Sequence, residues 1–243
     1  MITQAFRDKT VGSLLAEQPT RAAVFDKYKI DFCCGGGKSL AEACQARGAD
    51  VDAVISELLQ ADQQVEAEVE PPEVWLDKSI TELADHIEQV HHRFLKQELP
   101  RLQFLAEKVA RVHGEAHPEM IDLAHVFIAL KEEMETHTMK EERILFPYLR
   151  ALDRGERTAS CFGSVANPIK QMEFEHAEAG DALEQMRQLT NEYTVPEGAC
   201  NSWRALVDGL SRMDGDLRVH VHKENSILFP KALELERGLS ALA

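Results

Sequence analysis

The feature that most constrains this chain is a motif that occurs twice. The segment HTMKEERILFP at residues 137–147 recurs as HVHKENSILFP at residues 220–230, an offset of 83 residues. Both copies contain His-x-x-x-Glu and then Ile-Leu-Phe-Pro. Self-similarity at a long, fixed offset indicates a structural unit that is used more than once. The sequence therefore predicts a pair of helices that is repeated within one domain.

A further histidine precedes each copy at a matched distance: His92 lies 45 residues before His137, and His176 lies 44 before His220. Residues four apart on an α-helix share a face, about 6 Å apart along the axis, so a His and a Glu at that spacing can bind the same metal ion or two adjacent ions. Four-helix bundles build dinuclear sites from such inward side chains. We predict two imidazoles for each ion and two carboxylates able to bridge them, from His92, His137, Glu141, His176, His220 and Glu224.

The remaining histidines and nearby carboxylates have weaker signals. Metal-bound histidines usually donate their second ring nitrogen to a carboxylate, and three carboxylates lie four residues before a predicted ligand: Glu88, Glu133 and Asp216. A solvated surface charge is the alternative interpretation for each. We expect His91 and His222 to be peripheral, because each points about 100° away from the ligand face. The others are interpreted as structural: His86, His113, His117 and His125. Imidazole and carboxylate suit iron, manganese or zinc, so spacing alone does not choose the metal.

Hydrophobic periodicity near 3.6 from residue 74 onward predicts an all-α fold with four long helices in an up-down bundle. The first helix begins at Ser79, which forms a capping box with Glu82, and runs toward residue 113 with a kink at Pro100. The others are expected over 119–152, over 167–193 with Asn167 as N-cap, and over 196–236 with breaks at Gly215 and Pro230. Pro147 is expected to bend or end the second helix.

A small helical domain is predicted at residues 1–66, a linker at 67–78 and the bundle at 79–243. Helical stretches near 11–17 and 19–28 precede the segment DFCCGGGKSL, and Ser39 with Glu42 caps a helix that ends near Arg47. A last helix is expected over 51–65. The acidic, proline-containing segment EAEVEPPE is typical of a solvated linker.

Charge and hydropathy exclude several classes of protein. The chain has 243 residues, with 42 acidic and 27 basic side chains and a net charge of −15, which argues against nucleic acid as a partner because phosphate contacts need a basic face. The longest charge-free run, 158–169, is too short to span a bilayer. Charged residues from Arg7 onward interrupt any secretory signal. We therefore expect a cytoplasmic protein that binds neither nucleic acid nor membrane.

The motifs also resemble a known family. DFCCGG near residue 31, HHRFLKQELPRL, HTMKEERILFP, EFEHAEAG and HVHKENSILFP together resemble the iron–sulfur cluster repair di-iron proteins, in that family's domain order. Residues 79–236 resemble the hemerythrin-like cation-binding bundle. The resemblance implies a non-haem, oxo-bridged centre of two iron ions, and its ligands fall on the same six residues. Compared with oxygen-carrying hemerythrins the set has one fewer histidine, which argues against simple oxygen transport.

The family resemblance implies repair of iron–sulfur clusters after oxidative or nitrosative stress, with damaged iron–sulfur proteins as clients and nitric oxide or oxygen species as ligands. We expect an iron donor. A nitric oxide binding or reducing protein and a metal-dependent sensor module are the alternatives, so enzyme activity stays open, as does homodimer formation.

Adjacent cysteines are the second chemical signal. Cys33 and Cys34 stand beside three glycines, and the helix that begins after Ser39 is expected to favour thiolate. From the residues alone, a vicinal pair can form a strained disulfide, bind a soft metal or be incidental. The resemblance implies a functional element, such as a redox pair. The other three cysteines show no pairing pattern and are interpreted as packing residues: Cys44, Cys161 and Cys200.

Overall fold

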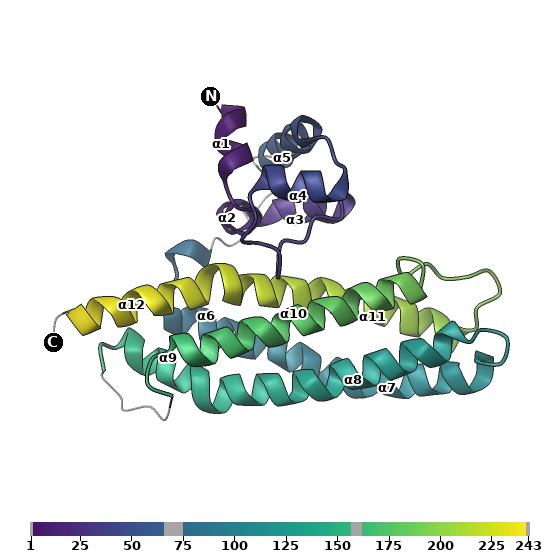
Figure 1. The fold of residues 1–243 in the computed structure, drawn as a ribbon. Helices are drawn as coiled ribbons and strands as arrows, with labels where there is room; N and C mark the ends of the chain where they lie inside the picture. Colours follow the sequence, from purple (N-terminus) through teal and green to yellow (C-terminus); the bar gives the residue numbers. More distant parts are fainter. Residues whose placement is uncertain (1, 66–74, 157–161, 242–243) are drawn as a thin grey trace. The chain divides into compact units, whose positions relative to one another are not determined.

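A computed structural model describes residues 2–65, 75–156 and 162–241. Over these ranges the backbone is mostly helical, and the one strand-like pairing is an isolated bridge between Thr10 and Ser39. The prediction of an all-α fold is confirmed (Figure 1). Among the described helices, none has the length and apolar character that crossing a membrane requires.

The chain divides into two compact units, one of residues 84–220 and one of residues 1–83 with 221–243. The division falls inside a continuous helix, between His220 and Val221. Most of the predicted linker lies outside the described residues, which omit 66–74. The domain boundaries at 66 and 79 therefore stay a prediction.

Four long helical segments follow each other from residue 80, and each except the third includes a π-helical stretch. Their bounds are α6 (Ile80–His86), η3 (Ile87–His92) and α7 (Arg93–His113); α8 (Glu119–Lys140), η4 (Glu141–Leu145) and α9 (Phe146–Asp153); α10 (Ala166–Leu189); and α11 (Asn201–Lys223), η5 (Glu224–Leu228) and α12 (Phe229–Ala241). Helix α8 packs against both α7 and α10 (Figure 1). Each of the four segments contributes buried apolar side chains, among them Leu102, Phe127, Leu183 and Leu210. Their apolar stripes explain why these segments pack together.

Several helix ends agree with the prediction. The first helix is capped by Ser79: the amide of Ser79 donates to Glu82 at 2.8 Å, and the amide of Glu82 donates to Ser79 Oγ at 3.1 Å. The second begins at Glu119, directly after Pro118, as expected. The first helix continues through Pro100 as part of α7.

The third and fourth helices differ from the prediction. Helix α10 begins at Ala166, so Asn167 lies inside it and Val165 is the N-cap. It ends at Leu189, because residues 191–193 adopt left-handed backbone angles (φ of 48°, 58° and 53°) that no α-helix contains. Helix α11 starts at Asn201 and runs without a break through Gly215.

The N-terminal helices of the other unit are short and pack around their own core. They are α1 (Ile2–Asp8), α2 (Val11–Glu17), the 3₁₀ turn η1 (Pro19–Arg21), α3 (Ala22–Lys27), α4 (Leu40–Arg47), α5 (Val51–Val65) and the 3₁₀ turn η2 (Trp75–Asp77). The bounds of α2, α5 and the capped α4 confirm the prediction, whereas the stretch expected over 19–28 splits into η1 and α3. Val11, Leu14, Phe25 and Leu58 are fully buried or nearly so.

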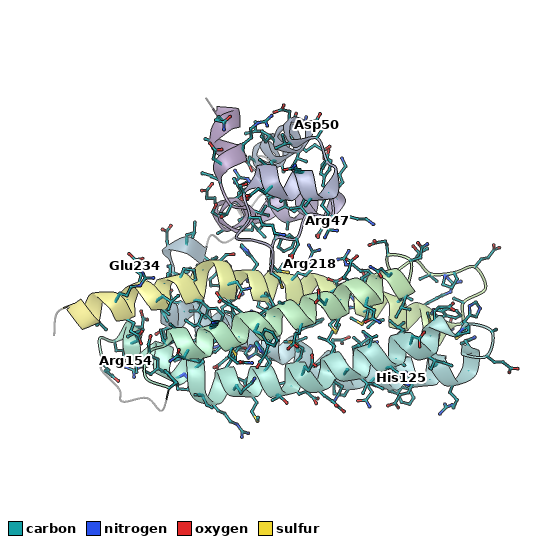
Figure 2. All side chains as sticks on the ribbon, in the orientation of Figure 1. Arg47, Asp50, His125, Arg154, Arg218 and Glu234 are labelled. Carbon is teal, nitrogen blue, oxygen red and sulfur yellow. The ribbon has the colours of Figure 1, made fainter. Side chains whose placement is uncertain are left out.

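His125 on α8 is exposed, which agrees with its interpretation as a residue outside the site (Figure 2). Arg154, directly after α9, is exposed as well and pairs with Glu156 at 2.6 Å (Figure 2).

Candidate metal centre

All six predicted ligands are buried, with at most 1% of each residue exposed. Three of them stand at the ends of π-helical stretches: His92 is the last residue of η3, and Glu141 and Glu224 are the first residues of η4 and η5. His137 and His220 lie one turn earlier on α8 and α11, and His176 lies near the middle of α10. Single π-helical turns inside α-helices are often found at functional sites.

The repeated proline explains where two of these π-helical turns occur. Stretches η4 and η5 both end two residues before a proline, Pro147 or Pro230. A proline ring clashes with the carbonyl four residues earlier and offers no N–H to it. That carbonyl belongs to Arg143 in one copy and to Ser226 in the other, inside the wider π-helical turn. The Ile-Leu-Phe-Pro part of the motif therefore shapes the helix directly after each ligand glutamate.

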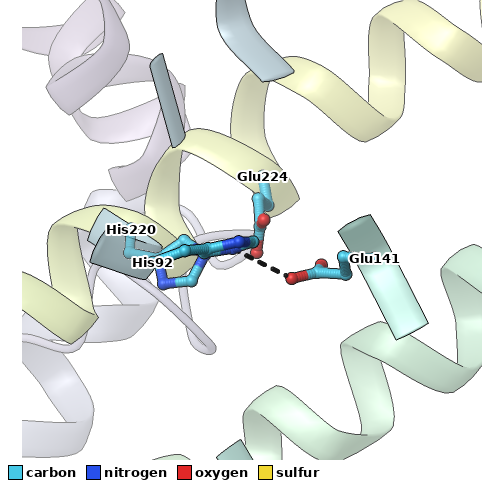
Figure 3. A group of neighbouring side chains, drawn as sticks. All are labelled: His92, Glu141, His220 and Glu224. Carbon is cyan, nitrogen blue, oxygen red and sulfur yellow. Dashed lines mark hydrogen bonds and ion pairs between the residues drawn. The ribbon is translucent and has the colours of Figure 1, made fainter. Parts of the chain in front are cut away.

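The donor atoms gather into two groups that share both carboxylates. One group contains His92 and His220 with Glu141 and Glu224, and the other contains His137 and His176 with the same two glutamates. Within each group the donor atoms lie within 4.8 Å of one another. Figure 3 shows the first group, with the two imidazoles side by side and the carboxylates converging on them. The structure thus brings together all six residues that the sequence predicted, with two imidazoles in each group as expected, and it shows that His92 pairs with His220 and His137 with His176.

The distances between donors suit bound cations. The Nε2 atoms of His92 and His220 are 3.3 Å apart, and those of His137 and His176 are 3.0 Å apart. Glu141 Oε2 lies 3.3 Å from Nε2 of both His92 and His137. Ligand atoms at about 2.1 Å from a metal ion are separated by roughly 3.0–3.4 Å at ordinary bond angles. Since buried carboxylates need pairing or metal coordination, a pair of cations fits this donor set.

Two carboxylates hold ligand imidazoles from outside. Glu142 Oε1 lies 2.9 Å from Nδ1 of His92, and Glu175 Oε2 lies 2.8 Å from Nδ1 of His137. The hydrogen bond with His137, helped by Lys140, lowers the pKa of Glu175 to about 2. Burial opposes ionisation of Glu142, but hydrogen bonds from Lys96 and His92 outweigh it and lower that pKa too. Both carboxylates are therefore charged at neutral pH and orient the Nε2 atoms inward.

The predicted partners of the ligand imidazoles were wrong. Glu88 lies 3.1 Å from Arg150, and Asp216 accepts from His91 instead of His220. Glu133 lines a pocket beside His137, whose Nδ1 is bound to Glu175. Carboxylates on the same helix do not face Nδ1, and those on the facing helix do. The sequence signal that could have identified the true partners is adjacency, because Glu142 follows the predicted ligand Glu141 and Glu175 precedes the predicted ligand His176.

Two histidines that we expected to be peripheral are buried. His91 is 3% exposed, binds Asp216 at 2.9 Å and stacks on His220 with ring centres 5.4 Å apart. His222 is 5% exposed and meets Phe32 edge-on, and its burial lowers its pKa to about 4. Neither belongs to a donor group, so both stay peripheral to the centre as expected. They are buried because a helix enclosed by neighbours is buried on more than its ligand face.

The remaining histidines belong to neither donor group. The ring of His86 meets His91 edge-on. His113 and His117 both contact the indole of Trp203, and Nε2 of His113 lies 3.3 Å from the sulfur of Cys200. Cys200 is exposed, so its interpretation as a packing residue was wrong, whereas Cys44 is buried as expected. Cys161 lies outside the described residues.

The two adjacent cysteines are not bonded to each other, since their sulfurs are 3.7 Å apart. Hydrogen bonding with Cys34 and burial raise the pKa of the Cys33 thiol well above its usual range. The expectation of a thiolate favoured by the helix after Ser39 was therefore wrong for Cys33. The carboxylate of Asp31 is the closer electrostatic neighbour, with Oδ1 3.1 Å from the Cys33 sulfur.

A pocket of about 320 Å³ lies against His137. It is lined mainly by acidic side chains, with one lysine: Glu132, Glu133, Glu175, Glu178 and Lys140. Met134, Thr136 and Gln171 complete the lining. The pocket therefore presents a negatively charged lining beside His137.

Comparison with known proteins defines the class first. Residues 85–232 match the model of the hemerythrin HHE cation binding domain, and residues 7–62 match a domain of unknown function, DUF542. The chain is thus a hemerythrin-type protein with a metal-cation-binding domain.

Its relatives define the family more narrowly. The iron-sulfur cluster repair proteins YtfE of Citrobacter koseri and Escherichia coli are each 38% identical to it over 231 residues, which cover 94% of this chain and 98% of theirs. YtfE of Escherichia fergusonii matches equally well. The chain belongs to this family of iron–sulfur cluster repair proteins.

Proposed function

We propose that this protein holds two iron ions between its six ligands and repairs damaged iron–sulfur clusters by supplying iron to them. The observation that carries the proposal is the pair of buried donor groups that share Glu141 and Glu224. Each group offers two imidazoles and two bridging carboxylates, a donor set that binds iron. The relatives' name supports cluster repair as the purpose of that iron.

The pocket beside His137 supports release of iron over reaction with a neutral gas. Its four glutamates and one lysine give a net negative lining, which attracts a cation and offers a neutral diatomic molecule nothing specific. His137 and its hydrogen-bond partner Glu175 both line it. A conformational change of either side chain would expose a bound ion to solvent or to a client.

We further propose that the clients are iron–sulfur proteins of the cytoplasm, where reducing conditions keep thiols free. The net charge of −15 favours approach to a basic client surface over short distances.

An isotope-transfer assay tests this proposal. The protein is loaded anaerobically with isotopically labelled iron and mixed with an apo-aconitase and sulfide. We expect the label in the restored cluster and recovery of aconitase activity. The control is Glu141→Gln, which removes the negative charge of a carboxylate that both donor groups share. This variant should lower both iron loading and transfer. A client that regains activity only with unlabelled iron from solution would refute delivery.

The same preparation separates delivery from gas chemistry. Addition of nitric oxide should yield no rapid nitrous oxide if the iron is cargo. Rapid nitrous oxide without client recovery would instead assign the centre to nitric oxide reduction. Stoichiometric zinc without iron in anaerobically purified protein would refute the di-iron assignment itself.

A further inference from the structure

A second group of metal-binding side chains lies in the loop between α3 and α4. Asp31, Cys33 and Cys34 each offer one donor atom, and these atoms lie within 4.8 Å of one another. The two sulfurs are 3.7 Å apart, and Asp31 Oδ1 is 3.1 Å from the Cys33 sulfur. None of the six bundle ligands belongs to this group.

We propose that Asp31, Cys33 and Cys34 form a separate mononuclear site for a thiophilic divalent cation such as Zn²⁺ or Fe²⁺. A tetrahedral ion with metal–sulfur bonds of about 2.3 Å holds two sulfurs roughly 3.8 Å apart. The observed separation of 3.7 Å matches that value. It is well beyond the length of about 2.05 Å of a disulfide bond. The pair is therefore spaced for a shared ion.

The loop holds the carboxylate in place before any ion binds. Asp31 Oδ1 accepts hydrogen bonds from the amides of Cys33 at 2.9 Å and Cys34 at 3.2 Å, and Oδ2 accepts from the amide of Gly35 at 2.7 Å. The thiol of Cys33 also donates to Oδ1. A carboxylate has about four lone-pair positions. A cation would take the position now filled by that thiol proton, leaving the amide hydrogen bonds intact.

Glycine is needed for this loop shape. A Cβ atom on Gly36 would lie 2.6 Å from the carbonyl oxygen of Phe32, and one on Gly35 would lie 2.9 Å from Asp31 Oδ2. The carbonyl of Gly36 accepts from the amide of Gly12 on α2 at 2.8 Å, which fixes the far side of the loop. The run of glycines thus allows the backbone to curl around the carboxylate and to present both sulfurs on one side.

Binding would balance as one divalent cation taken up and two thiol protons released to solvent. Three protein donors leave one position of a tetrahedral ion for an exogenous ligand, as in open zinc sites. Cys33 is 6% exposed, whereas Cys34 and Asp31 are partly exposed, so an ion would enter from the Cys34 side. The site does not depend on whether the bundle iron is cargo.

Cobalt(II) is the probe for this proposal, used on the full-length, fully reduced chain. A thiolate bound to Co²⁺ gives a charge-transfer band in the near ultraviolet, which the nitrogen and oxygen donors of the bundle cannot produce. We expect one equivalent of this band per chain, displaced by Zn²⁺. Cys33→Ser and Cys34→Ser should each lose most of its intensity, and Asp31→Asn should weaken Co²⁺ binding about tenfold or more.

Matched controls come from the other cysteines that the structure describes. Cys44→Ser, in the same unit, and Cys200→Ser, at an exposed thiol, should keep the full band. Helical circular dichroism checks that each variant folds. As an independent readout, Zn²⁺ should protect Cys33 and Cys34 of the unmodified chain from alkylation, but not Cys200. A missing band in the reduced chain, a band that persists in the Cys33 and Cys34 variants, or absence of protection would each overturn the proposal.

Discussion

Replacing Glu175 by Gln should weaken metal binding in one half of the centre. Glu175 accepts a hydrogen bond from Nδ1 of His137 at 2.8 Å and thereby holds the Nε2 atom toward its donor group. Glutamine keeps the size and one oxygen acceptor but loses the charge. The variant therefore tests the charge of the carboxylate with little change in packing.

The magnitude follows from the pKa of Glu175, which falls from 4.5 to about 2. That difference corresponds to about 3 kcal/mol at 1.36 kcal/mol per unit. Lys140 and Gln171 share it with His137, and a carboxylate that is 20% exposed is partly screened by solvent. We therefore assign about 1–1.5 kcal/mol to the His137 bond, or roughly a tenfold loss of affinity for one ion. Because the pKa is lowered, the contribution of Glu175 to the stability of the metal-free fold is complete above pH 4.5 and is lost as pH falls toward 2.

The assay is a competition titration at neutral pH between the protein and a chelator of known affinity. The matched control is Glu178→Gln, a neighbour on α10 that is exposed and lines the same pocket. We expect one weakened and one unchanged ion in the Glu175 variant, and two nearly unchanged ions in the control. Equal affinities in both variants, or an equal loss in both, would refute the positioning role of Glu175.

Four other variants test the fold and the centre. Gly209→Ala should destabilise the bundle by about 1–3 kcal/mol, because its Cβ would lie 2.5 Å from a methyl group of Leu102. A Cβ at Gly215 meets nothing within 4 Å, so Gly215→Ala should stabilise α11 by about 0.5–1 kcal/mol. Denaturant unfolding that gives the two variants stability changes of the same sign would contradict this packing. Burial beside Asp214 raises the pKa of Tyr193, so the neutral phenol stabilises the fold below pH 10 and this stabilisation is lost as pH rises further. Tyr193→Phe should remove the tyrosine that ionises last in an alkaline absorbance titration. An unchanged titration curve would contradict the raised pKa. His137→Ala should lower the bound metal from two ions toward one per chain. It should also lower the melting temperature, since metal binding is coupled to folding. Metal analysis that finds an unchanged number of ions per chain would remove this residue from the ligand set.

The sequence by itself determined the features that depend on spacing along one helix. The repeated His-x-x-x-Glu motif predicted four of the six ligands, because residues four apart share one face of a helix with 3.6 residues per turn. The matched distances of His92 and His176 from the two copies added the other two. The capping boxes at Ser39 and Ser79 predicted where two helices begin, since a cap and its partner are only three residues apart. Both signals are local, and the structure places them as expected.

Only the tertiary structure decided what depends on neighbouring helices. Glu142 and Glu175, not the carboxylates one turn before each ligand, hold His92 and His137. Glu142 on η4 meets His92 on η3, and Glu175 on α10 meets His137 on α8, so the packing of these segments determines which oxygen meets Nδ1. The burial of His91 has the same origin. The exposed pair of Cys200 and His113 is 87 residues apart in sequence. Contacts across helices depend on packing register, and no periodic pattern within a single helix encodes that register.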